Sequence, residues 1–363
     1  MKVLVTGGKG FIGQNLVIRL QEKHEVFSFD VDSDTSTLEK YIKKSDFTFH
    51  LAGVNRPTNP CDFYKGNVTL TETIIELIEA NNLTTPLLFS STTQVGNGSD
   101  YAKSKELAEK HVSEFAKRNG SKVYIYQLPG VFGKWCRPNY NSVVATFCHN
   151  IARDLPITVN DPRIELTLTY IDDITDVFMK VLEGDIQEPV SYKVTLGSIV
   201  QLLESFRDSR NTLSVPTVSD SFSKKLHATY LSYLPKDHFS YPLKMNFDER
   251  GSFTEILRTI HHGQFSVNII KPNIVKGNHW HHTKNEKFLV VSGEGVIRFR
   301  NIKPFGENEI LEYHVSGKDM EVVDIPPGYT HNIANTGNTD LVTFMWCNEP
   351  FNPDRPDTIF LEV

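Results

Sequence analysis

The sequence is poor in cysteine, in excess charge of one sign and in long apolar runs. Its four cysteines stand apart without a C-x-x-C pair, which argues against a disulfide framework or a thiolate zinc site. The net charge of −6 is dispersed over both signs, so we expect no surface for nucleic acid or an anionic membrane. No stretch approaches the roughly 20 apolar residues that span a bilayer, and the N-terminus carries no secretory pattern. We therefore expect a cytoplasmic protein with neither nucleic-acid nor membrane partners.

The length of 363 residues exceeds the size at which one hydrophobic core usually keeps growing, which predicts two domains. In the first half, short apolar runs alternate with amphipathic stretches. This alternation predicts an α/β unit of the Rossmann type, with a doubly wound parallel sheet. The expected strands are 1–6, 25–29, 47–52, 87–90 and 123–127, and the expected helices are 10–22, 72–81 and 101–117.

The pattern changes at about residue 243. Short β-rich segments broken by Gly, Pro or Asn follow, for example 265–270, 287–291, 295–299 and 341–346. They predict an all-β antiparallel barrel or jelly roll. The expected domains are therefore 1–242 and 243–363.

A glycine-rich loop follows the first expected strand and leads into the first expected helix. Glycines there let the backbone approach a pyrophosphate, and the N–H groups of the helix bind it. Asp30 ends the second expected strand, where a carboxylate accepts hydrogen bonds from the adenosine ribose and so slightly favours NAD over NADP. The residues of the loop expected to bind the cofactor are Gly7, Gly10, Phe11, Ile12 and Gly13.

Tyr101 and Lys105 are four residues apart on one face of an expected helix. A nearby cation stabilises the phenolate, so the tyrosine can exchange a proton with a substrate oxygen near neutral pH. Upstream, the hydroxyls of Ser91 and Thr92 follow an expected strand and could hold the same oxygen.

These motifs together resemble the short-chain dehydrogenase/reductase superfamily, in its extended branch that modifies nucleotide sugars. Further matches are residues 50–53 (HLAG), Asn67, 129–133 (PGVFG) and 170–173 (YIDD). The resemblance implies that Tyr101 is the acid/base, that Lys105 lowers its pKa and binds the nicotinamide ribose, and that Thr92 or Ser91 is the hydroxyl partner. It also implies cofactor contacts from Leu51, Ala52 and Gly53.

A second set of residues has the spacing of a metal site. His279, His281 and Glu286 fit H-x-H-x4-E-x6-G, and His331 fits P-x-G-x2-H-x3-N. Residues two apart on a strand face the same side, so both histidines of the first motif can point inward, while His282 competes for one ligand position. Three imidazoles and a carboxylate suit zinc or nickel, or iron and manganese where positions stay open. We expect zinc.

Residues 245–363 resemble the cupin superfamily, and residues 248–253 (DERGSF) resemble the substrate-contacting strand of the cupin-like dTDP-sugar 3,5-epimerases. The second resemblance implies that Arg250 contacts the nucleotide or its phosphates. In those epimerases a histidine at the place of His279 is the base. If His279 binds metal here, the base is another group, such as His282, Tyr329 or a metal-bound hydroxide.

The pairing of the two domains predicts the substrate chemistry. A 4-keto sugar has an acidic C3–H bond, because the carbanion becomes an enolate that a nearby cation stabilises. Epimerisation must therefore precede reduction, which removes the ketone.

The whole chain resembles a family of bifunctional enzymes of capsular polysaccharide synthesis. The resemblance implies C3 epimerisation of UDP-2-acetamido-2,6-dideoxy-4-hexulose and NADPH-dependent reduction at C4. The product would be UDP-2-acetamido-2,6-dideoxy-L-talose, on the route to UDP-N-acetyl-L-fucosamine. A homodimer is expected by analogy with cupins. The alternative is a monofunctional 4-reductase whose cupin domain only mediates dimerisation.

Overall fold

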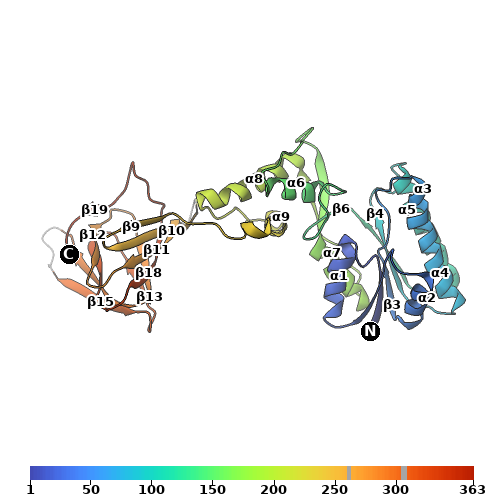
Figure 1. Cartoon of the computed structure of the whole chain (residues 1–363), viewed down its shortest axis with the longest axis horizontal. Coiled ribbons are helices and arrows are strands. Elements are labelled where there is room, and N and C mark those ends of the chain that lie inside the picture. The colour runs from blue at the N-terminus through green and yellow to red at the C-terminus, as the bar shows by residue number, and fades with distance from the viewer. Residues whose placement is uncertain (260–262, 304–308) are drawn as a thin grey trace. The chain divides into compact units, whose positions relative to one another are not determined.

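The computed structural model describes residues 1–259, 263–303 and 309–363. Within these ranges the chain forms two compact units (Figure 1). The second unit also includes a short earlier segment, which the sequence assigns to the first domain. Backbone hydrogen bonds explain this, because Arg258 donates to Leu213 (2.7 Å) and Val215 donates to Arg258 (2.9 Å). The first unit comprises Met1–Ser205 and Val218–Lys236, and the second comprises Phe206–Thr217 and Asp237–Val363.

The helices of the chain follow the amphipathic stretches of the sequence. None of the described helices combines the length and the apolar character that a membrane span requires. The α-helices are α1 (Phe11–Gln21), α2 (Thr35–Lys44), α3 (Cys61–Phe63), α4 (Leu70–Ala80), α5 (Asp100–Asn119), α6 (Val143–Ile151), α7 (Ile171–Leu182), α8 (Leu196–Thr212) and α9 (Ser221–Ser232). A π-helix, η1 (Tyr64–Thr69), precedes α4, and a short 3-10 helix is η2 (Lys236–His238).

The first unit is organised around a five-stranded parallel sheet. Its strands are β1 (Lys2–Thr6), β2 (Glu25–Phe29), β3 (Phe47–His50), β4 (Leu87–Thr92) and β5 (Val123–Leu128), in the order β2-β1-β3-β4-β5. Figure 1 shows α1 and α7 on one face of the sheet and α2, α4 and α5 on the other. Separate apolar clusters fill the two faces: Leu16 and Phe178 belong to one, and Ile74 and Phe115 to the other.

A smaller sheet completes the first unit. Its three strands are β6 (Gly130–Phe132), β7 (Glu165–Tyr170) and β8 (Ser191–Thr195), in the order β6-β7-β8. The pair β6·β7 is parallel and the pair β7·β8 is antiparallel.

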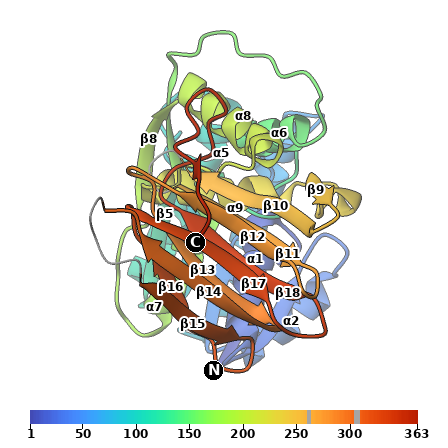
Figure 2. The ribbon, with the colours of Figure 1, turned by 90° about the vertical axis from the view of Figure 1, so that its left-hand side faces the viewer.

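The second unit consists of two antiparallel sheets (Figure 2). An apolar core lies between them. The strands are β9 (Met245–Asp248), β10 (Gly251–Thr259), β11 (Gly263–Ile270), β12 (Val275–Trp280), β13 (Glu286–Ser292), β14 (Glu294–Asn301), β15 (Ile310–Ser316), β16 (Val322–Ile325), β17 (Tyr329–Asn335), β18 (Leu341–Cys347) and β19 (Ile359–Phe360). The sheet orders are β16-β13-β18-β11-β10-β9 and β15-β14-β17-β12-β19. The core includes Phe288 and Val290 of β13 and Ile297 and Phe299 of β14, and the members of each pair are two residues apart, on one face of their strand.

The predicted fold class is confirmed. A parallel Rossmann-type sheet with helices on both faces is followed by a double antiparallel sheet consistent with a cupin jelly roll.

Candidate functional site

The glycine-rich loop joins β1 to α1, and its glycines are packed against backbone. Gly7 has a φ of +72°, and a Cβ there would lie 2.8 Å from the backbone of Ala52. A Cβ at Gly13 would lie 2.0 Å from the carbonyl oxygen of Gly7, which also accepts the N–H of Gly10 (2.9 Å). The loop therefore has no room for side chains at two positions, and it brings bare backbone to the start of α1. This arrangement fits a pyrophosphate.

The other predicted contacts of the cofactor surround this loop. Gly53 lies beside Asn67 and Lys105, since a Cβ there would lie 3.0 Å from Oδ1 of Asn67 and 3.8 Å from Nζ of Lys105. The N–H of Leu51 donates to the carbonyl of Thr6 (3.2 Å) and the N–H of Ala52 donates to its hydroxyl (3.3 Å), which attaches this segment to the end of β1. Phe11 and Ile12 form the first turn of α1, and Leu51, Ala52 and Gly53 follow β3.

Asp30 follows β2 and holds the glycine-rich loop. Its carboxylate accepts the N–H of Lys9 (2.6 Å) and the N–H of Val31 (3.1 Å). The ammonium of Lys9 pairs with Asp32. Asp30 thus has a structural function in addition to the predicted contact with the ribose.

Tyr101 and Lys105 both lie in the first turns of α5. The helix begins where the hydroxyl of Ser99 accepts the N–H of Ala102 (3.2 Å), a standard N-terminal cap. Lys105 is buried, and its ammonium donates to the carbonyl of Ser90 (2.6 Å). Burial lowers the pKa of Lys105 to about 8, against the opposing effect of a nearby glutamate.

Thr92 is the hydroxyl that contacts Tyr101. Burial raises the pKa of Tyr101, and the hydrogen bond with Thr92 opposes this rise. The hydroxyl of Thr92 also accepts the N–H of Gln94 (3.2 Å), which orients it. Ser91 lies one residue earlier on β4, and its buried hydroxyl has no partner among the described residues. Of the two predicted hydroxyls, the geometry therefore favours Thr92 as the partner of the tyrosine.

His50 forms the centre of a hydrogen-bond chain that the sequence did not predict. Thr71 donates its hydroxyl to the carbonyl of Asn67 (2.7 Å), so it accepts from Nε2 of His50 (2.8 Å). Nδ1 of His50 is then unprotonated and accepts from the hydroxyl of Thr6 (2.8 Å). Burial lowers the pKa of His50 to about 3, which keeps this ring neutral. The chain of bonds connects the ends of β1 and β3 to the π-helix.

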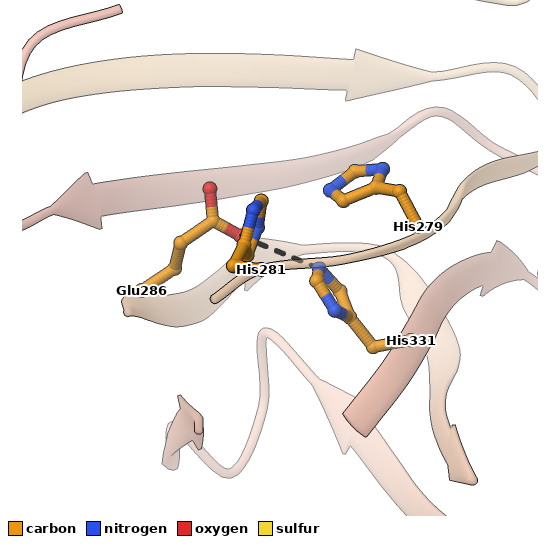
Figure 3. A group of neighbouring side chains, drawn as sticks. All are labelled: His279, His281, Glu286 and His331. Atoms are coloured by element: carbon orange, nitrogen blue, oxygen red, sulfur yellow. Dashed lines mark ion pairs between the residues drawn. The ribbon is translucent and has the colours of Figure 1, made fainter. Parts of the chain in front are cut away.

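Four predicted ligands converge in the second unit, as Figure 3 shows. Their ligand atoms lie within 4.8 Å of one another, although the residues come from separate strands and a loop. Oε2 of Glu286 lies 3.3 Å from Nε2 of His331 and 3.6 Å from Nε2 of His281. Within the described part of the chain, none of these three buried atoms has a hydrogen bond. These nitrogen and oxygen atoms are buried, point toward one point and receive no hydrogen bond, which is the arrangement that a divalent cation requires of its ligands.

The protonation states suit metal binding. Burial, together with neighbouring imidazoles, lowers the pKa of His279 to about 4, so this ring is neutral at neutral pH. Burial alone would raise the pKa of Glu286, but the contacts with His281 and His331 outweigh it and the net shift is downward. Neutral imidazole and ionised carboxylate are the forms that bind a metal.

The C-terminal segment orients one of these ligands. Nδ1 of His281 lies 2.6 Å from the carbonyl oxygen of Asp357. Because a carbonyl only accepts, Nδ1 carries the proton and Nε2 keeps its lone pair for the ligand group. The carboxylate of Asp357 accepts the N–H groups of His282 (3.0 Å), Thr283 (3.0 Å) and Lys284 (2.9 Å). Asp357 is far from the ligand motifs in sequence, so spacing offered no signal for it.

The ligand group opens into a cavity of about 640 Å³. Arg250, the predicted phosphate contact, lines this cavity and pairs with Asp248 (2.6 Å). Two of the candidate bases, His282 and Tyr329, are not among the described residues that line it. The ring of His282 instead contacts Trp280, with 4.5 Å between ring centroids.

Comparison with known proteins defines the class. Residues 3–195 match the NAD dependent epimerase/dehydratase family, and residues 246–359 match the polysaccharide biosynthesis C-terminal domain. The chain belongs to the NAD dependent epimerase/dehydratase family. This membership supports the predicted nicotinamide cofactor.

Two relatives match the chain over its full length and indicate a more specific class of enzyme. The capsular polysaccharide assembling protein CapF from Staphylococcus aureus has a crystal structure that matches with a TM-score of 0.94 and 51% identity, covering 100% of both chains. A UDP-2-acetamido-2,6-beta-L-arabino-hexul-4-ose reductase from Pseudomonas aeruginosa is 44% identical over 371 residues, covering 100% of this chain and 99% of the relative. The predicted resemblance to a capsular polysaccharide enzyme is confirmed.

A more distant structure shares the fold alone. The UDP-glucuronic acid 4-epimerase from Bacillus cereus in complex with NAD is 20% identical, with a TM-score of 0.55, and covers 64% of this chain and 96% of its own.

Proposed function

We propose that the chain is a bifunctional nucleotide-sugar enzyme of capsular polysaccharide synthesis. Residues 243–363, a zinc cupin, epimerise C3 of UDP-2-acetamido-2,6-dideoxy-4-hexulose. Residues 1–242 then reduce C4 with NADPH and form UDP-2-acetamido-2,6-dideoxy-L-talose, a precursor for UDP-N-acetyl-L-fucosamine. The main support for this proposal is that one chain contains two separate sites. One is the buried Lys105 in the helix of Tyr101, and the other is the group of three histidines and Glu286. The name of the Pseudomonas aeruginosa relative, a UDP-2-acetamido-2,6-beta-L-arabino-hexul-4-ose reductase, supports the reductase half.

In the first unit, Tyr101 acts as the acid of the reduction. When bound, NADPH supplies the hydride. The raised pKa of Tyr101 keeps its hydroxyl protonated at neutral pH, which is the state needed to donate a proton to the C4 oxygen. Thr92 holds the same oxygen through its hydroxyl. The cation of Lys105 on the same helix face stabilises the tyrosinate that remains after proton transfer.

In the second unit, His279, Glu286 and His331 line the cavity that would receive the sugar. A divalent ion held by the four ligands would act as a Lewis acid toward the carbonyl oxygen. Arg250 lines the same cavity and supplies a guanidinium for the pyrophosphate, as bidentate contacts of arginine with phosphate commonly do.

The order of the two reactions follows from carbonyl chemistry. The C3 proton is acidic only while C4 is a ketone, because the electron pair of the C3–H bond is delocalised onto the carbonyl oxygen. Reduction converts that ketone to an alcohol and fixes the configuration at C3. Epimerisation in the second unit therefore precedes reduction in the first.

We further propose a homodimer that forms through the second unit. Strand β9 lies at the edge of its sheet and its residues are exposed, Met245 and Phe247 among them. An exposed apolar edge can pair with another copy. Light scattering should give twice the chain mass of 41.2 kDa, and Phe247→Lys should shift the protein toward the monomer. A monomer at all concentrations would contradict the dimer and leave the enzymatic proposal intact.

The division of labour is tested by NMR of the UDP-4-keto sugar in deuterated water. Tyr101→Phe should abolish NADPH oxidation while deuterium still enters C3. His331→Ala should stop deuterium entry. If Tyr101→Phe loses both activities, or if metal-free protein forms the same inverted alcohol at an unchanged rate, the bifunctional proposal is wrong. The second result would favour a monofunctional reductase with a structural cupin domain.

A further inference from the structure

Strand β12 contains a bulge immediately before the first metal ligand. Its pairing with β17 joins Gly277 to Asn332 and His279 to His331, so Asn278 is an extra residue on one strand. Asn278 has a φ of +58°, and its side-chain oxygen accepts from the amide of Asn332 (2.8 Å). A bulge of this kind re-aims the side chains on either side of it.

Because of the bulge, Lys276 lines the same cavity as the ligand group. Residues three apart on a regular strand face opposite sides, so Lys276 and His279 would point apart. Both residues line the 640 Å³ cavity, together with Glu286 and His331. The sequence did not single out Lys276, because the effect depends on pairing with a distant strand.

Among the residues that the structure describes, the ammonium of Lys276 is bonded only to neutral oxygens. It donates to Oδ1 of Asn268 (3.0 Å), to the carbonyl of Ile269 (3.1 Å) and more weakly to the carbonyl of Ser252 (3.4 Å). Burial lowers the pKa of Lys276; the charge of Asp248 opposes this shift. The ammonium is thus held in place and partly desolvated, and it keeps one long hydrogen bond that a ligand can replace.

The other cations of the cavity wall differ from Lys276. Arg250 is bound to the carboxylate of Asp248 at 2.6 Å. Lys284 donates to the hydroxyl of Thr358 (3.2 Å), beside the C-terminal segment. Lys276 therefore combines a fixed position near the ligand group with a charge that no carboxylate contacts directly within the described ranges.

We propose that Lys276 is a catalytic residue of the second unit, whose ammonium donates a hydrogen bond to the C4 oxygen as the proton leaves C3. This inference rests on the proposed epimerisation. Solvent in the cavity accepts the C3 proton, the electron pair of the C3–H bond moves to the carbonyl oxygen, and Lys276 keeps its own proton throughout. The pair returns to carbon when solvent donates a proton to the opposite face of C3, so the step involves no net oxidation. A preorganised cation at a developing oxyanion lowers the barrier more than it strengthens ground-state binding.

The test separates this function from simple binding. Deuterium entry at C3 is measured by NMR at saturating UDP-2-acetamido-2,6-dideoxy-4-hexulose, with UDP affinity and zinc content measured on the same samples. Lys276→Met should slow exchange by about 10²-fold, with UDP affinity and zinc content unchanged. Lys276→Arg, which keeps the charge, should restore part of the rate. It also provides a test if the methionine variant does not fold.

Lys287→Met is the matched control. Lys287 lies on β13 in the same unit, is exposed and pairs with Asp324 outside the cavity. Its removal should leave exchange unchanged. A Lys276→Met variant that exchanges at the rate of the unmodified protein would overturn the inference. So would weaker UDP binding with a normal rate at saturation, which would make Lys276 a phosphate contact. Absence of exchange in the unmodified protein would instead contradict the proposed function itself.

Discussion

At the first site the buried Lys105 and His50 are already bonded to protein, whereas at the second site the buried ligand atoms are not. Lys105 donates to the carbonyl of Ser90, and both ring nitrogens of His50 have partners. In contrast, the lone pairs of His331 and Glu286 meet without a donor between them. The hydrogen bonds of Lys105 and His50 are thus made within the protein, whereas the ligand atoms of the second site are satisfied only by what they bind.

The contrast has an energetic consequence. A buried polar atom that loses its hydrogen bonds to water and gains none costs about 1–3 kcal/mol. Several such atoms lie together in the second unit, so its folded state carries a penalty that a cation relieves. We therefore expect a metal ion to stabilise the second unit without stabilising the first, and NADPH to stabilise the first without stabilising the second.

The largest expected effect is on the stability of the second unit when metal is removed. Zinc at about 1,000 times its Kd should stabilise the folded state by about 4 kcal/mol. Chelation should increase hydrogen exchange in peptides of β12, β13 and β17, measured by mass spectrometry on the full chain. Peptides of β1 and α1 should not change, and NADPH should protect them instead. An equal increase of hydrogen exchange in both units on chelation would contradict the claim that only the second site depends on a bound metal.

Next in size is the effect of Lys105→Met on reduction. The variant removes the cation that stabilises the tyrosinate, and we expect NADPH oxidation to fall about 10²-fold, or about 3 kcal/mol. Stability of the first unit at neutral pH should change little. The relieved desolvation of the ammonium is offset by the carbonyl of Ser90, which is left without its partner. Lys103→Met, an exposed change on the same helix, is the control.

The pH dependence of stability gives a second measurement on that variant. The pKa of Lys105 falls from 10.5 to about 8 on folding, so between these values the unfolded chain binds more protons than the folded chain. Stability of the first unit should therefore rise with pH across this window. Lys105→Met should lose that rise, as followed by hydrogen exchange in peptides of α5. A rise of equal size in the variant would show that Lys105 is not its source.

The sequence predicted elements that depend on local pattern better than those that depend on pairing. The strand 25–29 coincides with β2, and the helix 101–117 lies within α5. The four ligand residues were found by spacing alone, and they converge. The bulge at Asn278 was not predicted, because it exists only relative to β17. The hydrogen bond from His281 to Asp357 was missed for the same reason, since it connects segments far apart in sequence.

The bulge itself leads to a smaller expected effect. Gly277 has a φ of +107°, and a Cβ there would lie 2.9 Å from backbone atoms of His331 and Asn332. Gly277→Ala should destabilise the second unit by about 2 kcal/mol and lower its zinc content. Gly328→Ala is the matched control, because Gly328 also has a positive φ of +80° but open space around its Cα. It adds strain without a clash. Equal effects of the two variants would show that strain alone, and not close packing against β17, governs the bulge.

The smallest expected effect is on zinc affinity, when the residue that is changed orients a metal ligand but does not bind the metal itself. Asp357→Asn keeps the size of the side chain but weakens its bonds to the N–H groups of Thr283 and Lys284, so the carbonyl that faces His281 is held less firmly. Outer partners of metal-bound histidines typically account for about 10- to 100-fold in affinity, and an indirect change should lie near the lower end. Zinc affinity, measured by competition with a coloured chelator, should fall about 10-fold, while NADPH binding stays constant. Asp354→Asn, on the same segment but exposed, should leave both unchanged. Unaltered zinc affinity in Asp357→Asn would mean that the ligands are oriented by their own strands, and the second site would then resemble the first more closely.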